Sequence, residues 1–273
     1  MKKHDFLVCI DSDGCAMDTM DSKHISCFGP CLLPIWGLEA WQEEILVRWN
    51  EINLYTMTRG INRFKGLAIL LMEVDSKWKT ISGIETFVEW TEQAPELSSK
   101  SVDEQWKKTG NVIFKQAFEW SEMVNASIEK MPPETKKVFP GVREALKQIH
   151  AFADIAIVSS ANHQAVVDEW ERQELLPSVD MVMSQNMGSK SECIRFLLKN
   201  GYEKNHVLMM GDAPGDYQAA QENGVLFYPI LVRKEAESWK IFASQIAEAF
   251  CTGAYEGELQ KQMISQFKEN LSK

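Results

Sequence analysis

The sequence predicts an α/β fold, in which a parallel sheet carries helices on both faces and an all-helical domain is inserted after the first strand. An apolar run at residues 6–10 has the composition of a buried strand. Residues 139–230 alternate short apolar runs with helical patterns, which is typical of parallel strands joined by crossover helices. The intervening residues show helical periodicity alone. We therefore expect a discontinuous sheet domain of residues 1–20 and 138–273 and a helical domain of residues 21–137.

The first strand ends in two carboxylates and a glycine, Asp11-Ser12-Asp13-Gly14. Open α/β sheets place their ligands at the carboxyl ends of their strands. Alternate residues of an extended chain point the same way, so Asp11 and Asp13 would address one site if the strand continued through Ser12. Gly14 indicates a bend at this point. The alternative is a simple acidic turn, since aspartate and glycine are common turn residues.

The inserted segment shows apolar residues at helical spacing. Trp41, Ile45, Trp49 and Ile52 recur at intervals of four, four and three, and no convincing strand interrupts residues 21–138. Seven of the nine tryptophans lie here, at positions 36, 41, 49, 78, 90, 106 and 120. We expect these rings to pack in a separate apolar core rather than to bind a ligand. The segment Met131-Pro132-Pro133 breaks the helical pattern.

The alternation that follows defines the rest of the sheet domain. We expect strands at residues 155–158, 179–183, 207–210 and 225–230, with helices at residues 162–173, 189–199, 215–222, 235–250 and 256–271.

Polar residues stand at several strand ends and helix starts. Ser159 and Ser160 follow one strand and could donate hydrogen bonds to an oxyanion, although serines there often cap a helix. Lys190 falls in the first turn of a helix, where a cation opposes the macrodipole, and this unfavourable position suggests a function. The alternative is a solvated surface lysine.

A second carboxylate pair follows the strand at 207–210. Asp212 comes directly after Gly211, and Asp216 begins the next helix. This arrangement could be a capped turn. It is also suited to Mg²⁺, a hard cation that takes oxygen ligands, usually one or two carboxylates with several waters.

Composition limits the classes of partner. The 273 residues are 45% hydrophobic and 25% charged, with 29 Lys and Arg against 39 Asp and Glu, a net charge of −10. This balance argues against nucleic acid, which needs a basic face. The apolar stretch before Asp11 is too short for a signal peptide or a membrane span, so we expect a cytoplasmic protein without membrane contact. The six cysteines indicate reduced thiols, and a zinc site at His24, Cys27 and Cys31 lacks a fourth ligand.

The run Asp11-Ser12-Asp13-Gly14-Cys15 resembles the first motif of the haloacid dehalogenase-like (HAD) superfamily, although Cys15 stands where threonine or valine is usual. The ordered set of Ser159, Lys190, and the pair Asp212 and Asp216 resembles the remaining motifs. The resemblance covers residues 3–20 and 139–230. It implies a Rossmann-like HAD core, and the insertion resembles the helical cap that many members carry at that place.

The resemblance also implies roles. Asp11 matches the nucleophile that becomes an aspartyl phosphate, and Asp13 matches the general acid that later activates water. Ser159, with Ser160 beside it, matches the hydroxyl that holds the phosphoryl group, and Lys190 matches the lysine that neutralises it. The metal-binding positions for Mg²⁺ are Asp11, Asp13 through its carbonyl, Asp212, and Asp216 as an indirect partner.

Charge supports these roles independently. Four aspartates and a phosphate dianion would bring about six negative charges together, and such self-repulsion requires compensating cations. Magnesium and Lys190 would supply three positive charges, and the remaining imbalance favours one protonated carboxyl group, as a general acid requires.

The expected activity is magnesium-dependent hydrolysis of a small phosphorylated metabolite. A phosphomutase of the same family remains an alternative because it keeps these residues, and so does a non-catalytic regulatory protein on the same fold. Asp13 argues against dehalogenases and phosphonatases, which generally lack this acid.

Residues 59–65 gather three cations in an otherwise acidic chain. If Arg59 and Arg63 share one face of a helix, they could bind an anionic part of the substrate. The alternative is a solvated helix face that serves only solubility.

Overall fold

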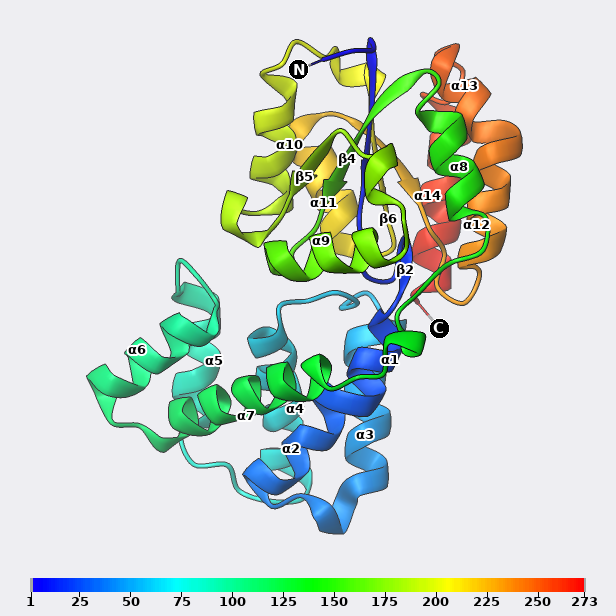
Figure 1. Ribbon diagram of the computed structural model, residues 1–273. Helices are drawn as coiled ribbons and strands as arrows, with labels where there is room; N and C mark the ends of the chain where they lie inside the picture. The colour runs from blue at the N-terminus through cyan, green and yellow to red at the C-terminus, as the bar shows by residue number, and fades with distance from the viewer. Residues whose placement is uncertain (1, 273) are drawn as a thin grey trace. The chain divides into compact units, whose positions relative to one another are not determined.

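The computed structural model describes residues 2–272, which divide into two compact units. The sheet unit contains the residues up to Met20 and those from Glu134 onward, and the helical unit contains Asp21–Pro133 (Figure 1). Residues 134–137, which we assigned to the insertion from sequence, thus belong to the sheet unit. Among residues 2–272, no helix has both the length and the apolar character needed to cross a bilayer.

The sheet unit contains a five-stranded parallel sheet in the order β5-β4-β1-β6-β7. The central strand β1 pairs with β4 on one side, where Phe6 lies opposite Ala153, and with β6 on the other, where Leu7 lies opposite Val207. A strand between two neighbours and two helical layers has both faces buried, which explains its continuous apolar sequence. The strands are β1 (Phe6–Ile10), β4 (Ala153–Val158), β5 (Met181–Met183), β6 (Val207–Gly211) and β7 (Leu226–Pro229).

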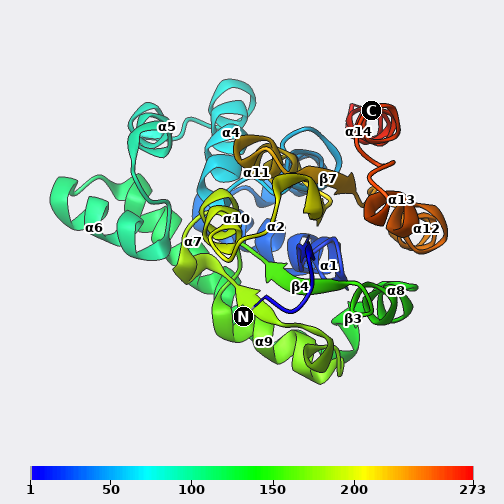
Figure 2. The ribbon, with the colours of Figure 1, turned by 90° about the horizontal axis from the view of Figure 1, so that it is seen from above.

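Helices cover both faces of this sheet. Side chains from α8, α9, α12 and α13 share one apolar core with alternate strand residues such as Val8 and Ile10. Figure 2 shows α10 and α11 on the opposite side of the sheet from α8 and α9. The predicted α/β fold with helices on both faces is confirmed. The helices are α8 (Val142–Ile149), α9 (His163–Arg172), α10 (Lys190–Leu198), α11 (Pro214–Asn223), α12 (Glu235–Ile241), α13 (Ala247–Cys251) and α14 (Glu258–Asn270).

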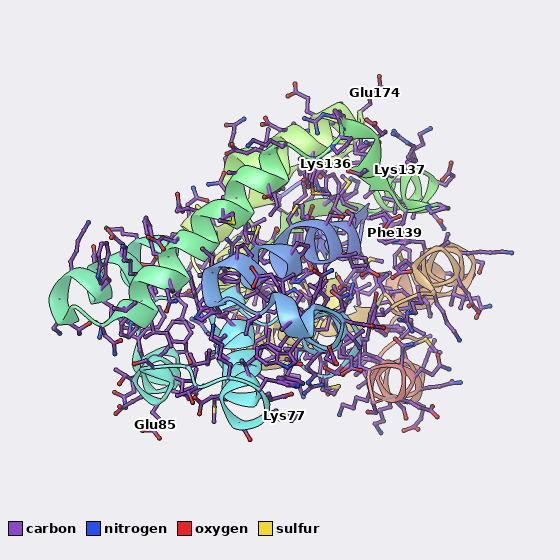
Figure 3. The ribbon with its side chains drawn as sticks, turned by 90° about the horizontal axis from the view of Figure 1, so that it is seen from below. Lys77, Glu85, Lys136, Lys137, Phe139 and Glu174 are labelled. Atoms are coloured by element: carbon purple, nitrogen blue, oxygen red, sulfur yellow. The ribbon has the colours of Figure 1, made fainter. Side chains whose placement is uncertain are left out.

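A short antiparallel ribbon joins the two chain segments of the sheet unit, and the sequence analysis missed it. It pairs β2 (Met17–Asp18) with β3 (Lys137–Val138), and the Phe139 amide donates to the Ala16 carbonyl at 3.0 Å. Figure 3 labels Lys136, Lys137 and Phe139, which lie in or next to β3. The expectation of no strand within residues 21–138 was therefore wrong, because β3 lies inside this range. Two-residue strands are too short to show an alternating pattern, so only the pairing reveals them.

The helical unit has its own apolar core. Trp36, Trp49 and Trp120 are buried in it, and the rings of Trp49 and Trp120 meet edge to face at 5.7 Å. The packing role expected for these tryptophans is confirmed. The helices are α1 (Met20–Lys23), α2 (Gly29–Trp36), α3 (Gln42–Asn50), α4 (Arg63–Lys77), α5 (Ile84–Gln93), α6 (Ser99–Thr109) and α7 (Val112–Glu129), and the π-helical turns His24–Phe28 and Glu51–Tyr55 follow α1 and α3.

Candidate active site

The candidate site lies at the carboxyl ends of the three middle strands. Asp11 follows β1, Ser159 follows β4 and Asp212 follows β6. Because these strands are parallel neighbours, their carboxyl ends meet at one edge of the sheet. The Asp11 amide also donates to the Met210 carbonyl of β6 at 3.0 Å, so the sheet pairing continues up to the first carboxylate.

Three buried carboxylates form a cluster at this edge. Oxygens of Asp11, Asp212 and Asp216 lie within 4.8 Å of one another, and their residues are 6%, 0% and 0% exposed. Gly211 makes this approach feasible, since a Cβ at this position would lie 2.2 Å from Asp216 Cγ. Within residues 2–272, this is the only group of three or more acidic, histidine or cysteine side chains close enough to share a metal ion.

Lys190 joins two of these carboxylates. It is the first residue of α10, and its Nζ lies 2.8 Å from Asp11 Oδ2 and 2.5 Å from Asp216 Oδ1. Burial alone would lower the pKa of Lys190, but the two carboxylates raise it above its usual value. Burial raises the pKa of Asp11 well above its usual value, Lys190 opposes this effect, and Asp216 and Asp212 add to it. Lys190 therefore stays charged at the start of a helix because the two carboxylates stabilise its positive charge.

Asp13 lies on a turn rather than on the strand. β1 ends at Ile10, and the turn closes with the Ala16 and Met17 amides donating to the Ser12 carbonyl. Gly14 has a φ of 81°, a conformation that favours glycine. Asp13 is only partly buried, its side chain is outside the carboxylate cluster, and its Oδ1 accepts a hydrogen bond from Thr19 Oγ1. The bend indicated by Gly14 thus separates the environments of the two aspartates.

The two serines after β4 differ in exposure. Ser159 is 3% exposed, and its amide donates to the Met183 carbonyl of β5 at 3.0 Å. Its Oγ accepts a hydrogen bond from the Ala161 amide at 3.2 Å, which leaves the hydroxyl hydrogen able to donate elsewhere. Ser160 is exposed. The helix cap at this place is Asn162, whose side chain accepts from the Gln164 and Ala165 amides, so the serines do not serve as the N-cap of α9.

The two predicted cap arginines do not share a helix face, which corrects the sequence analysis. α4 begins at Arg63 with Asn62 as its N-cap, and Arg59 lies in the preceding turn, where Gly60 has a φ of 68°. The Arg59 side chain is 1% exposed, its Nη1 donates to the Leu54 carbonyl at 2.7 Å, and it lies 3.9 Å from Asp21 Oδ1. The asparagine cap and the glycine turn break the four-residue spacing that a single helix would need.

Arg63 has neutral partners. Its Nη1 donates to Ser121 Oγ at 3.0 Å and to Asn125 Oδ1 at 2.9 Å, and its guanidinium lies 4.9 Å from the centre of the Phe28 ring. Burial lowers the pKa of Arg63 to about 10, and the charge of Glu122 opposes this shift. A cation in such surroundings is well suited to attract an anion.

The sequence analysis missed three side chains that hold the first motif. Thr19 contacts Asp13, and the indoles of Trp170 and Trp239 donate to Ser12 Oγ and to the Cys15 carbonyl, each at 2.9 Å. Thr19 lies only six residues after Asp13, so its position in the sequence could have suggested this contact. The tryptophans lie 158 and 224 positions from their partners, and no local pattern connects them.

The chain was compared with known proteins. Among solved structures, the fold is similar to a putative phosphoglycolate phosphatase from Lactobacillus delbrueckii subsp. bulgaricus, with a TM-score of 0.51, 13% identity, and coverage of 84% of this chain and 86% of that chain. A putative beta-phosphoglucomutase from Thermotoga maritima gives a TM-score of 0.47 at 17% identity, covering 82% and 84% of the two chains. A haloacid dehalogenase-like hydrolase from Streptococcus pneumoniae gives 0.46 at 10% identity, covering 86% and 90%.

No curated protein matches the sequence significantly. The model of the haloacid dehalogenase-like hydrolase family matches residues 74–230, which include Ser159, Lys190, Asp212 and Asp216. This match spans more than half of the chain, and the structure places Asp11 beside three of these residues. The protein therefore belongs to the haloacid dehalogenase-like hydrolases.

Proposed function

We propose that the protein is a magnesium-dependent phosphohydrolase that cleaves a small phosphorylated metabolite through an aspartyl-phosphate intermediate. The observation that carries the proposal is the contact of Lys190 with Asp11 and Asp216, within 2.8 Å of each, beside the buried Asp212. A largely buried cation, 14% exposed, among several carboxylates is suited to collect negative charge that arrives with a phosphoryl group.

The donor set fits Mg²⁺. Asp11, Asp212 and Asp216 present only carboxylate oxygens within 4.8 Å of one another, and this cation prefers oxygen ligands. Asp11 and Asp212 would hold the ion, with Asp216 beside them. When bound, Mg²⁺ would offset the mutual repulsion of the carboxylates and the substrate phosphate.

Asp11 is the proposed nucleophile. Its Oδ1 accepts a hydrogen bond from the Ser12 amide at 2.8 Å, and its Oδ2 contacts Lys190, so both oxygens are held in defined directions. One oxygen attacks phosphorus and the bond from phosphorus to the leaving oxygen breaks, which forms an aspartyl phosphate. Lys190 and the Ser159 hydroxyl hold the phosphoryl oxygens during this step.

Asp13 is the proposed general acid and base. Thr19 Oγ1 donates to Asp13 Oδ1 and so fixes the direction of the carboxyl group that would carry and transfer a proton. In the first step Asp13 gives this proton to the leaving oxygen, and in the second it accepts a proton from the water that hydrolyses the aspartyl phosphate. The partly solvated position of Asp13 suits both transfers.

The test compares wild-type protein and the Asp13→Asn variant on an aryl and an alkyl phosphate. We expect turnover of both phosphates by the wild type with Mg²⁺ and none above background with EDTA. Asp13→Asn should slow the alkyl phosphate at least about tenfold more than p-nitrophenyl phosphate, because only the poor leaving group needs protonation. Equal losses of turnover on the two phosphates would show that Asp13 is not the general acid. An inactive wild type would favour the alternative of a non-catalytic regulatory protein. Transfer of phosphate back to a sugar phosphate instead of release would identify a phosphomutase.

We also propose that Arg63 binds an anionic group of the substrate, supported by its partly buried cation and neutral partners. Arg63→Ala should lower kcat/KM at least about tenfold for the best substrate in a panel of phosphorylated metabolites, and Arg63→Lys should recover part of the loss. Hydrolysis of p-nitrophenyl phosphate, which has no second anion, is the internal control. Unchanged kcat/KM on every substrate would show that Arg63 has only a structural role.

Arg59, proposed from sequence with Arg63, has a carbonyl and a carboxylate partner and is better suited to hold the turn before α4.

A further inference from the structure

The turn that carries Asp11 and Asp13 is anchored by two buried indoles. Trp170 of α9 donates from Nε1 to Ser12 Oγ at 2.9 Å, and Trp239 of α12 donates to the Cys15 carbonyl at 2.9 Å. Both indoles are 0% exposed and Ser12 is 1% exposed, so water cannot replace either donor. Each end of the turn is thus attached to a different helix of the sheet unit.

Ser12 transmits its position directly to Asp11. The Ser12 amide donates to Asp11 Oδ1 at 2.8 Å, while Lys190 contacts the other oxygen at 2.8 Å. A shift of Ser12 would therefore rotate or displace one of the two donors that orient the Asp11 carboxylate. Orientation matters here because a misplacement of about 1 Å at a reacting group can cost about a hundredfold in rate.

The helix that carries Trp170 also begins at the proposed phosphate-binding loop. α9 starts at His163 with Asn162 as its cap, a few residues after Ser159 and Ser160, and reaches Trp170 two turns later. One rigid element thus connects the loop after β4 with the turn after β1. A buried indole usually finds an acceptor, although those of Trp36 and Trp49 have none among the described residues. The acceptor of Trp170 is the side chain next to Asp11 rather than a distant backbone carbonyl.

We propose that Trp170 is a positioning residue that orients Asp11 through Ser12. This inference rests on the proposed function, because it concerns the residue that the proposal makes the nucleophile. The ring of Trp170 fills the core of the sheet unit, and its Nε1–H sets the position of Ser12.

The experiment breaks the same hydrogen bond from both sides. Ser12→Ala removes the acceptor with little change in volume, and Trp170→Phe removes the donor. We expect each to lower kcat about tenfold on p-nitrophenyl phosphate with KM changed less than about twofold, since orientation rather than binding is lost. The double variant should be no slower than the slower single variant, because both changes remove one interaction.

Tyr255→Phe is the matched control. The Tyr255 hydroxyl is buried and donates to the Phe227 carbonyl of β7 at 2.7 Å, away from the Asp11 turn. This variant should lower the melting temperature through the loss of a buried hydrogen bond and leave kcat unchanged. The inference would be overturned if Ser12→Ala and Trp170→Phe also lowered the melting temperature without changing kcat. It would also be overturned if the loss of kcat in the double variant equalled the combined losses of the two single variants.

Crystal structures separate this inference from the proposed function. If wild-type protein has no phosphatase activity, the proposed function fails. In that case the geometry of Ser12→Ala and Trp170→Phe decides the inference alone. Displacement of Asp11 Oδ1 from the residue 12 amide in both variants supports it, and an unchanged distance of about 2.8 Å overturns it.

Discussion

The Asp11→Asn variant is expected to lose more than about a thousandfold in kcat on every phosphate ester that the wild type hydrolyses. An amide oxygen is a poor nucleophile toward phosphorus, so no aspartyl phosphate forms. The change keeps the volume of the side chain and its acceptor for the Ser12 amide, which the wild type binds at 2.8 Å. Steady-state rates with excess Mg²⁺ measure the loss, and thermal unfolding with inorganic phosphate tests whether the site still binds the anion.

Asp154→Asn supplies a control matched for burial. Asp154 is 0% exposed but lies near the start of β4, where its Oδ2 accepts from Tyr202 at 2.5 Å and from the Lys3 amide at 2.9 Å. We expect Asp154→Asn to lower stability with little effect on kcat. Retention of more than about a thousandth of wild-type kcat by Asp11→Asn would exclude Asp11 as the nucleophile.

Replacement of Lys190 by Met is expected to reduce kcat about 100- to 1000-fold and to destabilise the fold. The rate falls because the charge that would stabilise the transferring phosphoryl oxygens is gone. Stability falls because the lysine contacts two buried carboxylates, at 2.8 Å and 2.5 Å, and loss of one partner from a buried charge cluster costs about 3–5 kcal/mol. Steady-state kinetics and urea unfolding of metal-free protein measure the two effects.

A second change separates the two effects. Lys190→Met combined with Asp216→Asn removes one of the carboxylates left without a cation, so stability should partly return while activity stays low. Lys190→Arg keeps the charge and should retain more activity than Lys190→Met. Wild-type kcat in Lys190→Met would refute the role of the lysine in holding phosphate. Wild-type stability of that variant would show that the contacts with Asp11 and Asp216 contribute little to folding.

The sequence alone determined the fold class and predicted which main candidate site residues would lie close together. Asp11, Ser159 and Asp212 each follow an apolar strand, and Lys190 and Asp216 each lie in the first turn of a helix. Parallel strands necessarily bring such positions to one edge of the sheet, so their proximity follows from local patterns and chain order. The contacts among Asp11, Lys190 and Asp216 were predictable for this reason.

Only the tertiary structure decided how that group is held. The ribbon of β2 and β3 depends on pairing between segments more than a hundred residues apart, and each strand is too short for periodicity to mark it. Arg59 and Arg63 have a helical spacing in the sequence, yet an asparagine cap and a glycine turn separate them. The bond from Trp170 to Ser12 has no local signal either, because a core tryptophan has the same sequence pattern whichever acceptor its indole finds. Local patterns specify which residues face the core or end a strand, whereas the direction of one polar atom is set by packing across the whole domain.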